Sequence, residues 1–243
     1  MSNILEQIVS KKKLRIKNLT ATIDNDIDIK PQKTFLTKGS PQIIAEIKRG
    51  SPSLGLLKPD LDIEAVAQHY KNIGACAISV LTEEDYFFGS IEDLVRAKQA
   101  SGLPILRKDF IFSEAQIVES AQIGADAILL MVSVIKEAGR LKQLLELAHK
   151  LGLSVLVETH ERQEIQIALE AGAKIIGVNN RDLRTFQTDI SLSLDLKALI
   201  PSHIISVSES GIKNKEHISL LSAQGYDAFL IGEAFLHDLN FLC

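Results

Sequence analysis

The sequence predicts an α/β protein built as a single (β/α)8 TIM barrel, and three observations lead to this expectation. Eight short apolar runs alternate with amphipathic stretches at a period of about 20 to 30 residues. The 243-residue chain has the size of such a domain. No G-x-G-x-x-G or G-x-x-x-x-G-K-[ST] segment occurs, which counts against the competing open, doubly wound sheet. We expect one domain over residues 1–243, with residues 1–42 as an N-terminal helical extension.

The expected strands are near-continuous apolar runs, as in a parallel sheet that is covered on both faces. They lie at residues 43–49, 75–81, 104–110, 125–133, 154–160, 174–179, 203–208 and 228–231. The stretches between them predict helices, such as 63–73, 113–123, 138–151 and 162–171. Six runs follow a glycine placed where the end of a helix needs a left-handed residue, at Gly74, Gly102, Gly124, Gly152, Gly172 and Gly225. This alternation implies parallel strands with right-handed crossovers.

The N-terminal extension is expected to contain one helix, over residues 3–19, because apolar residues from Ile4 to Val9 recur at helical spacing. Residues 20–42 are polar and irregular, and they form a leader ahead of the first strand. Three consecutive lysines at positions 11–13 are expected on the solvated face of the helix.

Composition excludes several classes of function. With 46% hydrophobic and 24% charged residues the chain can bury a large core, and its net charge of −4 argues against a nucleic-acid surface. Cys76 and Cys243 form neither a disulfide framework nor a spaced metal set, which fits a reducing cytosol. No run of about 20 apolar residues is present to span a membrane. We expect a cytoplasmic protein that binds neither nucleic acid nor membranes.

Polar residues end several of the expected strands, and TIM barrels carry their active sites at this end. In the segment IIAEIKRGSPS, Glu46 and Lys48 share one strand face with Ile44, because side chains alternate along a strand. Taken singly, each such residue could form a structural ion pair or cap a helix. Together they predict one pocket of interacting acids and bases. The predicted catalytic residues are Glu46, Lys48, Lys108, Glu158, Asn179 and Glu209.

The last two units predict an anion site. Ser210 and Gly211 follow the seventh strand and Gly232 follows the eighth, where small residues let backbone N–H groups approach a phosphate. The alternative is that both glycines only serve tight turns. The six histidines show no metal-ligand spacing, so no metal is expected. His160 could line the rim of the pocket, but a core or surface role is favoured.

With these residues in view, the chain resembles the indole-3-glycerol phosphate synthase family. The matching segments are IAEIKRGSPS, AISVLTEEDYFFGS, ILRKDFI, ADAILLMVS, VLVETH, IIGVNNRDL, VSESGI and FLIGEA, in the order the family has them. They cover nearly the whole chain. The K-R-x-S-P-S, L-T-E-x-x-Y-F-x-G-S and G-V-N-N-R-D-L blocks together are highly specific.

The resemblance implies a decarboxylating carbon–carbon lyase of tryptophan biosynthesis. Its phosphosugar substrate, 1-(2-carboxyphenylamino)-1-deoxyribulose 5-phosphate, is closed to indole-3-glycerol phosphate with loss of CO₂ and water and with no cofactor. Lys108 looks like the acid near the developing alkoxide, and Glu158 looks like the base of the dehydration. Lys48 matches the lysine that contacts the substrate carboxylate and is a candidate second acid. Which lysine serves which step stays open.

The remaining site residues are also implied by the resemblance. Glu46 would orient Lys48 and the sugar hydroxyls, and Asn179 and Glu209 would align the intermediate. The other matches are substrate-binding positions: Ser51 and Arg181 near the carboxylate, Ser210, Gly211, Gly232 and Glu233 at the phosphate, and Phe87, Phe110 and Leu183 around the aromatic ring. Other tryptophan-pathway enzymes are conceivable partners.

Two alternatives to the synthase and two departures from the family pattern belong to this expectation. The alternatives are a non-catalytic barrel that binds a phosphorylated ligand and another phosphosugar barrel such as phosphoribosylanthranilate isomerase. Paired lysines on the first and third strands count against the isomerase. Leu54 stands where the family often has a lysine, and only eleven residues follow Gly232, fewer than the usual final helix needs. The second departure is expected to affect stability more than catalysis.

Overall fold

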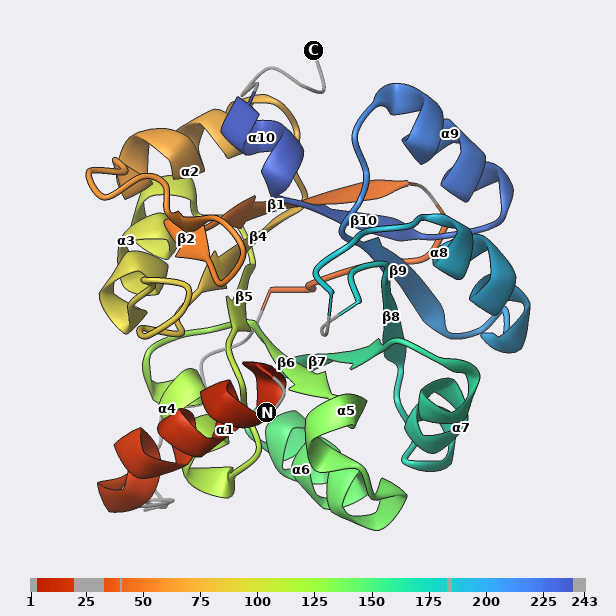
Figure 1. Ribbon diagram of the computed structural model, residues 1–243, viewed down its shortest axis with the longest axis horizontal. Helices are drawn as coiled ribbons and strands as arrows, with labels where there is room; N and C mark the ends of the chain where they lie inside the picture. Colours follow the sequence, from red (N-terminus) through yellow and green to blue (C-terminus); the bar gives the residue numbers. More distant parts are fainter. Residues whose placement is uncertain (1–3, 20–32, 40, 183–184, 238–243) are drawn as a thin grey trace.

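Eight parallel strands close into a barrel in the computed structural model, which describes residues 4–19, 33–39, 41–182 and 185–237 (Figure 1). They are β1 (Gln42–Ile47), β4 (Ala77–Leu81), β5 (Ile105–Lys108), β6 (Ala127–Met131), β7 (Ser154–Thr159), β8 (Ile175–Asn179), β9 (Ile205–Glu209) and β10 (Ala228–Ile231). Neighbours in the barrel are neighbours in this order along the chain, and β10 pairs with β1 to close it. The TIM-barrel prediction is confirmed, and each strand lies within two residues of its expected bounds.

Helices surround the strands on the outside of the barrel (Figure 1). They are α2 (Ile63–Asn72), α3 (Ile91–Ser101), α4 (Glu114–Gln122), α5 (Val132–Ile135), α6 (Ala138–Lys150), α7 (Arg162–Glu170), α8 (Ser191–Leu196), α9 (Lys215–Ala223) and α10 (Glu233–His237), with the 3-10 turn η2 (Lys197–Leu199). Side-chain oxygens begin several of them: Ser113 and Gln116, for example, form a reciprocal capping box at α4. All six glycines predicted to follow helices have positive φ, as expected.

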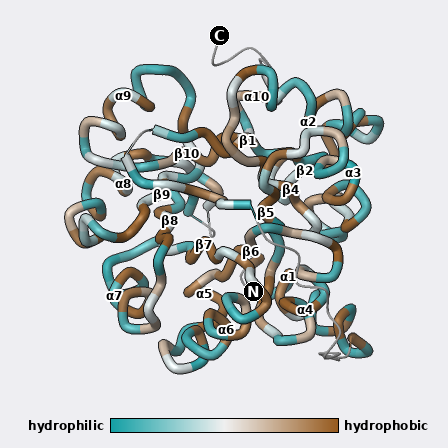
Figure 2. The backbone as a smooth tube through the Cα atoms, turned by 180° about the vertical axis from the view of Figure 1, so that it is seen from behind, coloured by the Kyte–Doolittle hydropathy of each residue, from teal (hydrophilic) through white to brown (hydrophobic). Residues whose placement is uncertain are grey.

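The strands separate two apolar regions because their side chains alternate between two faces. On β1, Ala45 and Ile47 pack into the larger core between barrel and helices. Ile44 instead points into the barrel, where it belongs to a second core with Leu106 and Leu156. Figure 2 shows the strands as predominantly hydrophobic segments inside a ring of more polar ones. The inward face continues at the C-terminal ends of the strands as polar residues.

The N-terminal extension contains α1 (Ile4–Arg15) and the 3-10 turn η1 (Ile16–Asn18), as predicted. The expectation of a solvated lysine face is correct for Lys11 and Lys13 but wrong for Lys12, which is 3% exposed. Its Nζ lies 2.9 Å from a carboxylate oxygen of Glu84 and 2.9 Å from one of Asp109. Both acids follow barrel strands, β4 and β5, so Lys12 attaches α1 to the C-terminal end of the barrel.

None of the expected strands covers the segment after β1, and the structure has a small hairpin there. Strands β2 (Gly50–Ser51) and β3 (Gly55–Leu56) pair antiparallel there. Two-residue strands carry no alternation pattern, so the sequence gives no signal for them. None of the described helices is both long and apolar enough to cross a bilayer.

Candidate active site

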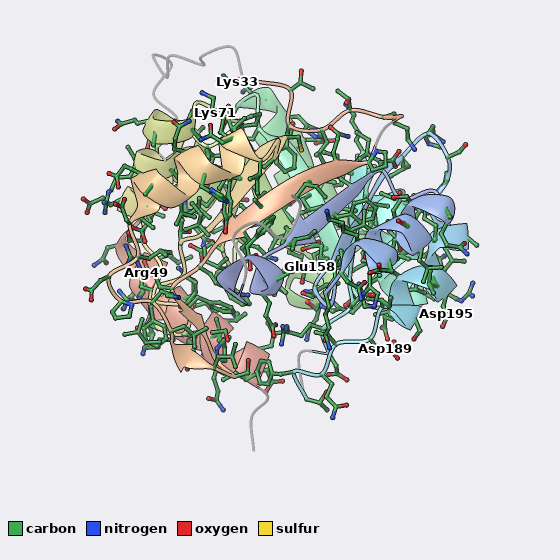
Figure 3. The ribbon with its side chains drawn as sticks, turned by 90° about the horizontal axis from the view of Figure 1, so that it is seen from above. Lys33, Arg49, Lys71, Glu158, Asp189 and Asp195 are labelled. Atoms are coloured by element: carbon green, nitrogen blue, oxygen red, sulfur yellow. The ribbon has the colours of Figure 1, made fainter. Side chains whose placement is uncertain are left out.

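A cavity with about 760 Å³ of empty space, part of it open to solvent, lies at the C-terminal ends of the strands. Its walls contain eleven of the predicted residues: Glu46, Lys48, Ser51, Phe87, Lys108, Phe110, Glu158, Asn179, Arg181, Ser210 and Glu233. An adjoining cavity adds Gly211 and Gly232. Glu209 is buried behind the wall and contacts Lys108, whereas Leu183 lies outside the described residues. In Figure 3, Glu158 lies towards the middle of the molecule, and Asp189 and Asp195 lie at its edge.

Four charged side chains form a continuous chain of ion pairs on one side of this cavity. Lys48 and Lys108 on neighbouring parts of the wall both bind Glu46, each with Nζ 3.2 Å from a carboxylate oxygen. Lys108 also reaches Glu209 across the barrel, at 3.3 Å from its Oε2. Side chains alternate between the two faces of β1 and β5, which brings these charged groups together. Glu46 and Lys48 follow Ile44 on the inner face of β1, and Lys108 follows Leu106 on the inner face of β5.

Burial and the contacts between these side chains together set the pKa values of Glu46, Lys108 and Glu209. Burial alone would raise the pKa of Glu46, but Lys108 and Lys48 outweigh it and lower the value to about 2. Burial would likewise lower the pKa of Lys108, and the carboxylates of Glu46, Glu209 and Glu158 together raise it instead. For Glu209 burial wins over Lys108 and raises its pKa to about 8. Burial thus favours the protonated form of Glu209, and the surrounding acids favour the cationic form of Lys108.

Glu158, near the end of β7, lines the same cavity and is 1% exposed. Its Oε1 is buried and has no hydrogen-bond partner among the described residues. A buried carboxylate oxygen without a partner is costly unless a ligand supplies one.

Two glycines make room for the carboxylates that hold Lys108. A Cβ on Gly177, in the middle of β8, would collide with Oε1 of Glu209. A Cβ on Gly232, just after β10, would collide with Oε1 of Glu46 and lie 3.1 Å from its Cβ. The sequence predicts a phosphate-loop role for Gly232, and the structure adds this second one. The sequence alone cannot show which carboxylate lies against each glycine, because this depends on which strands are neighbours in the barrel.

The loops after β8, β9 and β10 are tied together beside the cavity. Arg181 pairs with Glu233 at 2.7 Å, and the backbone N–H of Arg181 donates to Oδ1 of Asn179 at 3.1 Å. Asn180 turns away from the cavity and donates through Nδ2 to the carbonyl oxygens of Glu209 and Ser210. Ser210 has φ +63°, in the left-handed region, and this contact supports the strained turn.

Apolar side chains line the wall next to Lys108. The rings of Phe87 and Phe110 lie 6.1 Å apart, between centroids. The loop that carries Phe87 is held by Glu83, whose Oε2 accepts the backbone N–H groups of Tyr86 at 2.7 Å and Phe87 at 3.0 Å. Leu129, Met131 and Phe186 are among the wall residues that sequence reasoning missed. Strand alternation along β6 gives a signal for Leu129 and Met131, but Phe186 lies in an irregular loop and has none.

His160 lies next to the cavity, where sequence reasoning favoured a core or surface role. It follows β7 by one residue, its side chain is 16% exposed, and its Nε2 lies 3.4 Å from Oε1 of Glu158. The signal for this position was present, because residues two apart on a strand point to the same side.

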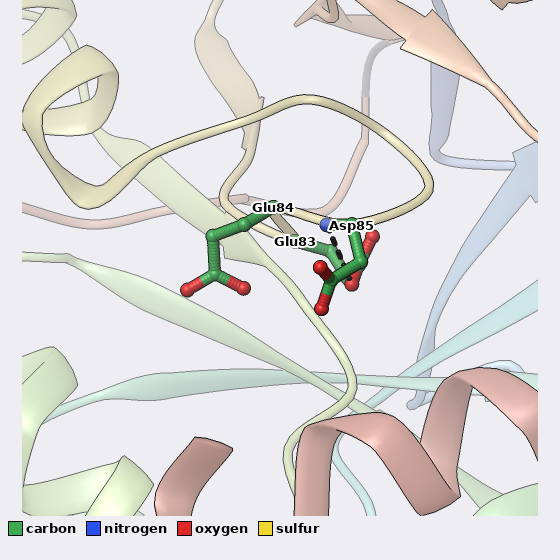
Figure 4. A group of neighbouring side chains, drawn as sticks. All are labelled: Glu83, Glu84 and Asp85. Carbon is green, nitrogen blue, oxygen red and sulfur yellow. Dashed lines mark hydrogen bonds between the residues drawn. The ribbon is translucent and has the colours of Figure 1, made fainter. Parts of the chain in front are cut away.

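In the described part of the chain, one group of three carboxylates is compact enough to share a metal ion: Glu83, Glu84 and Asp85 (Figure 4). Each of them already has protein partners. Glu83 accepts backbone N–H groups, Glu84 pairs with Lys12, and Asp85 binds Arg15 at 2.6 Å. The group therefore serves to hold the loop after β4 and helix α1.

Comparison with known proteins identifies the family. The barrel is shared with the N-acetylmannosamine-6-phosphate 2-epimerase from Clostridium perfringens, at a TM-score of 0.62 over 82% of this chain and 88% of that one. At 16% identity this likeness shows the fold alone. The sequence model of indole-3-glycerol phosphate synthase, however, matches residues 4–241. The chain belongs to the indole-3-glycerol phosphate synthase family.

Two relatives illustrate how close the match is. The indole-3-glycerol phosphate synthase of Endomicrobium trichonymphae is 44% identical over 98% of this chain and 96% of its own length. That of Dehalococcoides mccartyi (strain BAV1) is 51% identical over 82% of this chain and 78% of its own. The resemblance drawn from the motifs is thus confirmed. Membership in the synthase family makes the chain a decarboxylating lyase of tryptophan biosynthesis that acts on a small phosphorylated substrate.

Proposed function

We propose that this chain closes the indole ring of 1-(2-carboxyphenylamino)-1-deoxyribulose 5-phosphate with Lys108 as the acid and Glu158 as the base. The observation that carries the assignment is their placement: a lysine that binds Glu46 and Glu209 lines the same cavity as Glu158, a buried acid with an unpartnered oxygen. An acid and a base that line one cavity can act on two positions of one substrate.

The first step needs a proton donor. The ring carbon that bears the carboxylate attacks the ketone carbon, and the electron pair of the C=O bond moves to its oxygen. Lys108 donates a proton to this alkoxide, and Glu46 and Glu209 keep its ammonium group in place for the transfer. Loss of CO₂ then returns the electrons of the C–C bond to the ring. The ring becomes aromatic again, and a hydroxyl group remains on the new five-membered ring.

The second step removes that hydroxyl. A second proton, which we assign to Lys48, converts it to leaving water, with the ring nitrogen supplying electrons. Glu158 then takes a proton from the neighbouring carbon to form the indole double bond. The lysines give two protons and Glu158 receives one, so each turnover takes up one proton from solvent. This balance matches the loss of an ionised carboxylate as CO₂.

The rest of the cavity is proposed to hold the two ends of the substrate. Backbone N–H groups of the Ser210–Gly211 and Gly232–Glu233 segments would bind the phosphate. Arg181 and Ser51 would lie near the carboxylate, and the ring would rest on the wall of Phe87, Phe110 and Leu183. Asn179 would align the intermediate. We place this reaction in the cytoplasm and regard other enzymes of the tryptophan pathway as candidate partners.

The test is turnover of the substrate by purified protein, followed by indole fluorescence without added metal. We expect turnover by the wild type. Lys108→Ala should lower kcat by roughly 10²- to 10⁴-fold, because the alkoxide loses its proton donor. The matched control is Lys71→Ala, an exposed lysine on α2 at the outside of the barrel (Figure 3), which should leave kcat unchanged. Near-normal kcat in the Lys108 variant would remove this residue from the mechanism.

A further inference from the structure

Next to the base Glu158, one side chain is placed to contact its unpartnered oxygen. Nε2 of His160 lies 3.4 Å from Oε1 of Glu158, and both atoms are buried without a hydrogen-bond partner in the part of the chain that the structure describes. Contacts between catalytic groups are often long in an empty site and shorten when substrate is bound. Two buried polar atoms that lie 3.4 Å apart and lack a hydrogen-bond partner therefore point to a functional contact.

The imidazole ring is held from its other side by Glu164, in the first turn of α7. Oε2 of Glu164 accepts the backbone N–H of His160 at 2.6 Å and lies 3.3 Å from Nδ1. One carboxylate oxygen thus contacts both the backbone and the ring of the same residue. This fixes the orientation of the ring, with Nδ1 towards Glu164 and Nε2 towards Glu158.

The charges around the ring favour its protonated form. The ionisable groups that face it are Glu158 on β7, Glu164 on α7 and Glu209 on β9. Burial alone would lower the pKa of His160, but the hydrogen bond to Glu164 and the carboxylates of Glu158 and Glu209 together raise it. A cationic ring can donate two hydrogen bonds at the same time, one from Nδ1 to Glu164 and one from Nε2 to Glu158.

We propose that His160, held by Glu164, is a positioning residue that binds one oxygen of Glu158 and so directs the other oxygen at the substrate. The inference rests on the proposed role of Glu158 as the base. The cavities support action through Glu158: Glu158 lines the substrate cavity, whereas His160 and Glu164 line a neighbouring one. His160 is not among the residues that line the cavity of Glu158, so we assign it an action through this carboxylate rather than on the substrate.

The experiment compares His160→Gln and Glu164→Gln in the full chain, with kcat and KM measured across pH. His160→Gln should lower kcat by about tenfold or more with little change in KM, because the carboxylate loses its orientation but the substrate contacts remain. Glu164→Gln should lower kcat less. It should also move the alkaline fall of kcat to lower pH, since a ring without this carboxylate gives up its proton more easily. An exposed histidine provides the control: His203→Gln should behave as wild type.

A double-mutant cycle separates positioning from a general structural effect. In a Glu158→Gln background, His160→Gln should cost no further activity, because there is no base left to orient. An equal cost in both backgrounds, or unchanged kcat and pH profile in the single variants, would overturn the inference. If Glu158→Gln itself retained full kcat, the proposed function of Glu158 would fail instead. If Glu158→Gln loses activity and His160→Gln does not, only the positioning role is wrong.

Discussion

Buried carboxylates occur at both ends of this barrel, and they differ in how their oxygens are used. At the N-terminal ends of the strands, Asp227 accepts from the backbone N–H of Ser206 at 2.8 Å, from its hydroxyl at 2.9 Å and from Lys38 at 3.1 Å. Asp126 likewise accepts from the N–H of Ile105 and from Lys98. Each joins the start of one strand to the start of its neighbour.

At the C-terminal ends of the strands, two buried carboxyl groups keep an oxygen without a hydrogen-bond partner. Oε1 of Glu158 and Oε1 of Glu209 have no hydrogen-bond partner among the residues described, although both side chains are almost completely buried. Burial alone therefore does not distinguish a structural carboxylate from a catalytic one. Glu158 and Glu209 each keep an unpartnered oxygen, which leaves capacity for a substrate, whereas Oδ2 of Asp227 and of Asp126 collects the bonds that join neighbouring strands.

The largest effect expected from this comparison is on activity. Glu158→Gln should reduce kcat by about 10²- to 10⁴-fold, because the amide cannot accept the proton of the dehydration. The melting temperature should stay at or above that of the wild type, since the change removes a buried charge. Thermal unfolding and steady-state kinetics on one preparation test both parts. A large loss of stability would place Glu158 with the structural carboxylates.

A smaller loss of activity is expected from Gly232→Ala. The added methyl group displaces Glu46, which holds both lysines, and a misplacement of about 1 Å can cost roughly 10²-fold. We expect a fall in kcat in addition to any rise in KM from the phosphate loop. A variant that changes KM alone would show that Glu46 adapts and that Gly232 matters only to the phosphate.

Asp227→Ala tests the other end of the barrel. The backbone N–H of Ser206 would lose its partner in a buried position, which costs about 1–3 kcal/mol in the free energy of unfolding. Urea denaturation measures this loss. Activity per folded molecule should be unchanged, because Asp227 lies at the opposite ends of the strands from the cavity. Lower kcat at full folding would contradict the division between the two ends.

The last expected effect is a pH dependence of stability. The pKa of Glu209 is raised to about 8 in the folded state, so between its unfolded value of about 4.3 and pH 8 the folded protein binds more protons than the unfolded one. Glu209 therefore makes the protein less stable as pH rises through this window. Glu209→Gln should remove that decline, so its stability relative to wild type should increase from pH 5 to pH 8. Denaturation curves that differ equally at both pH values would exclude the raised pKa.

Local pattern was sufficient for most of the fold. Apolar runs and the glycines after helices predicted all eight barrel strands, and alternation placed Glu46, Lys48 and Lys108 on the inner face. Contacts between distant segments were not predictable in this way. Lys12 looked like one exposed lysine among three, because its acidic partner Asp109 is 97 residues away.

The site likewise has features that the sequence predicts and features that depend on contacts between distant segments. Strand ends and motifs predicted the residues of the cavity, but the space that Gly177 and Gly232 leave for carboxylates depends on which strands are neighbours. The sequence favours a core or surface role for His160, since a histidine two residues beyond a glutamate has many ordinary roles. Its contact with Glu164 requires the turn into α7, which the sequence shows only as a helix start.

The buried acids Glu158 and Glu209 beside the cavity have a consequence for substrate binding. A ligand with a carboxylate and a phosphate brings negative charge into the cavity, which favours protonation of nearby acids. Capture of substrate should therefore draw protons from the medium. In calorimetry, the apparent heat of association would then change with the ionisation enthalpy of the buffer.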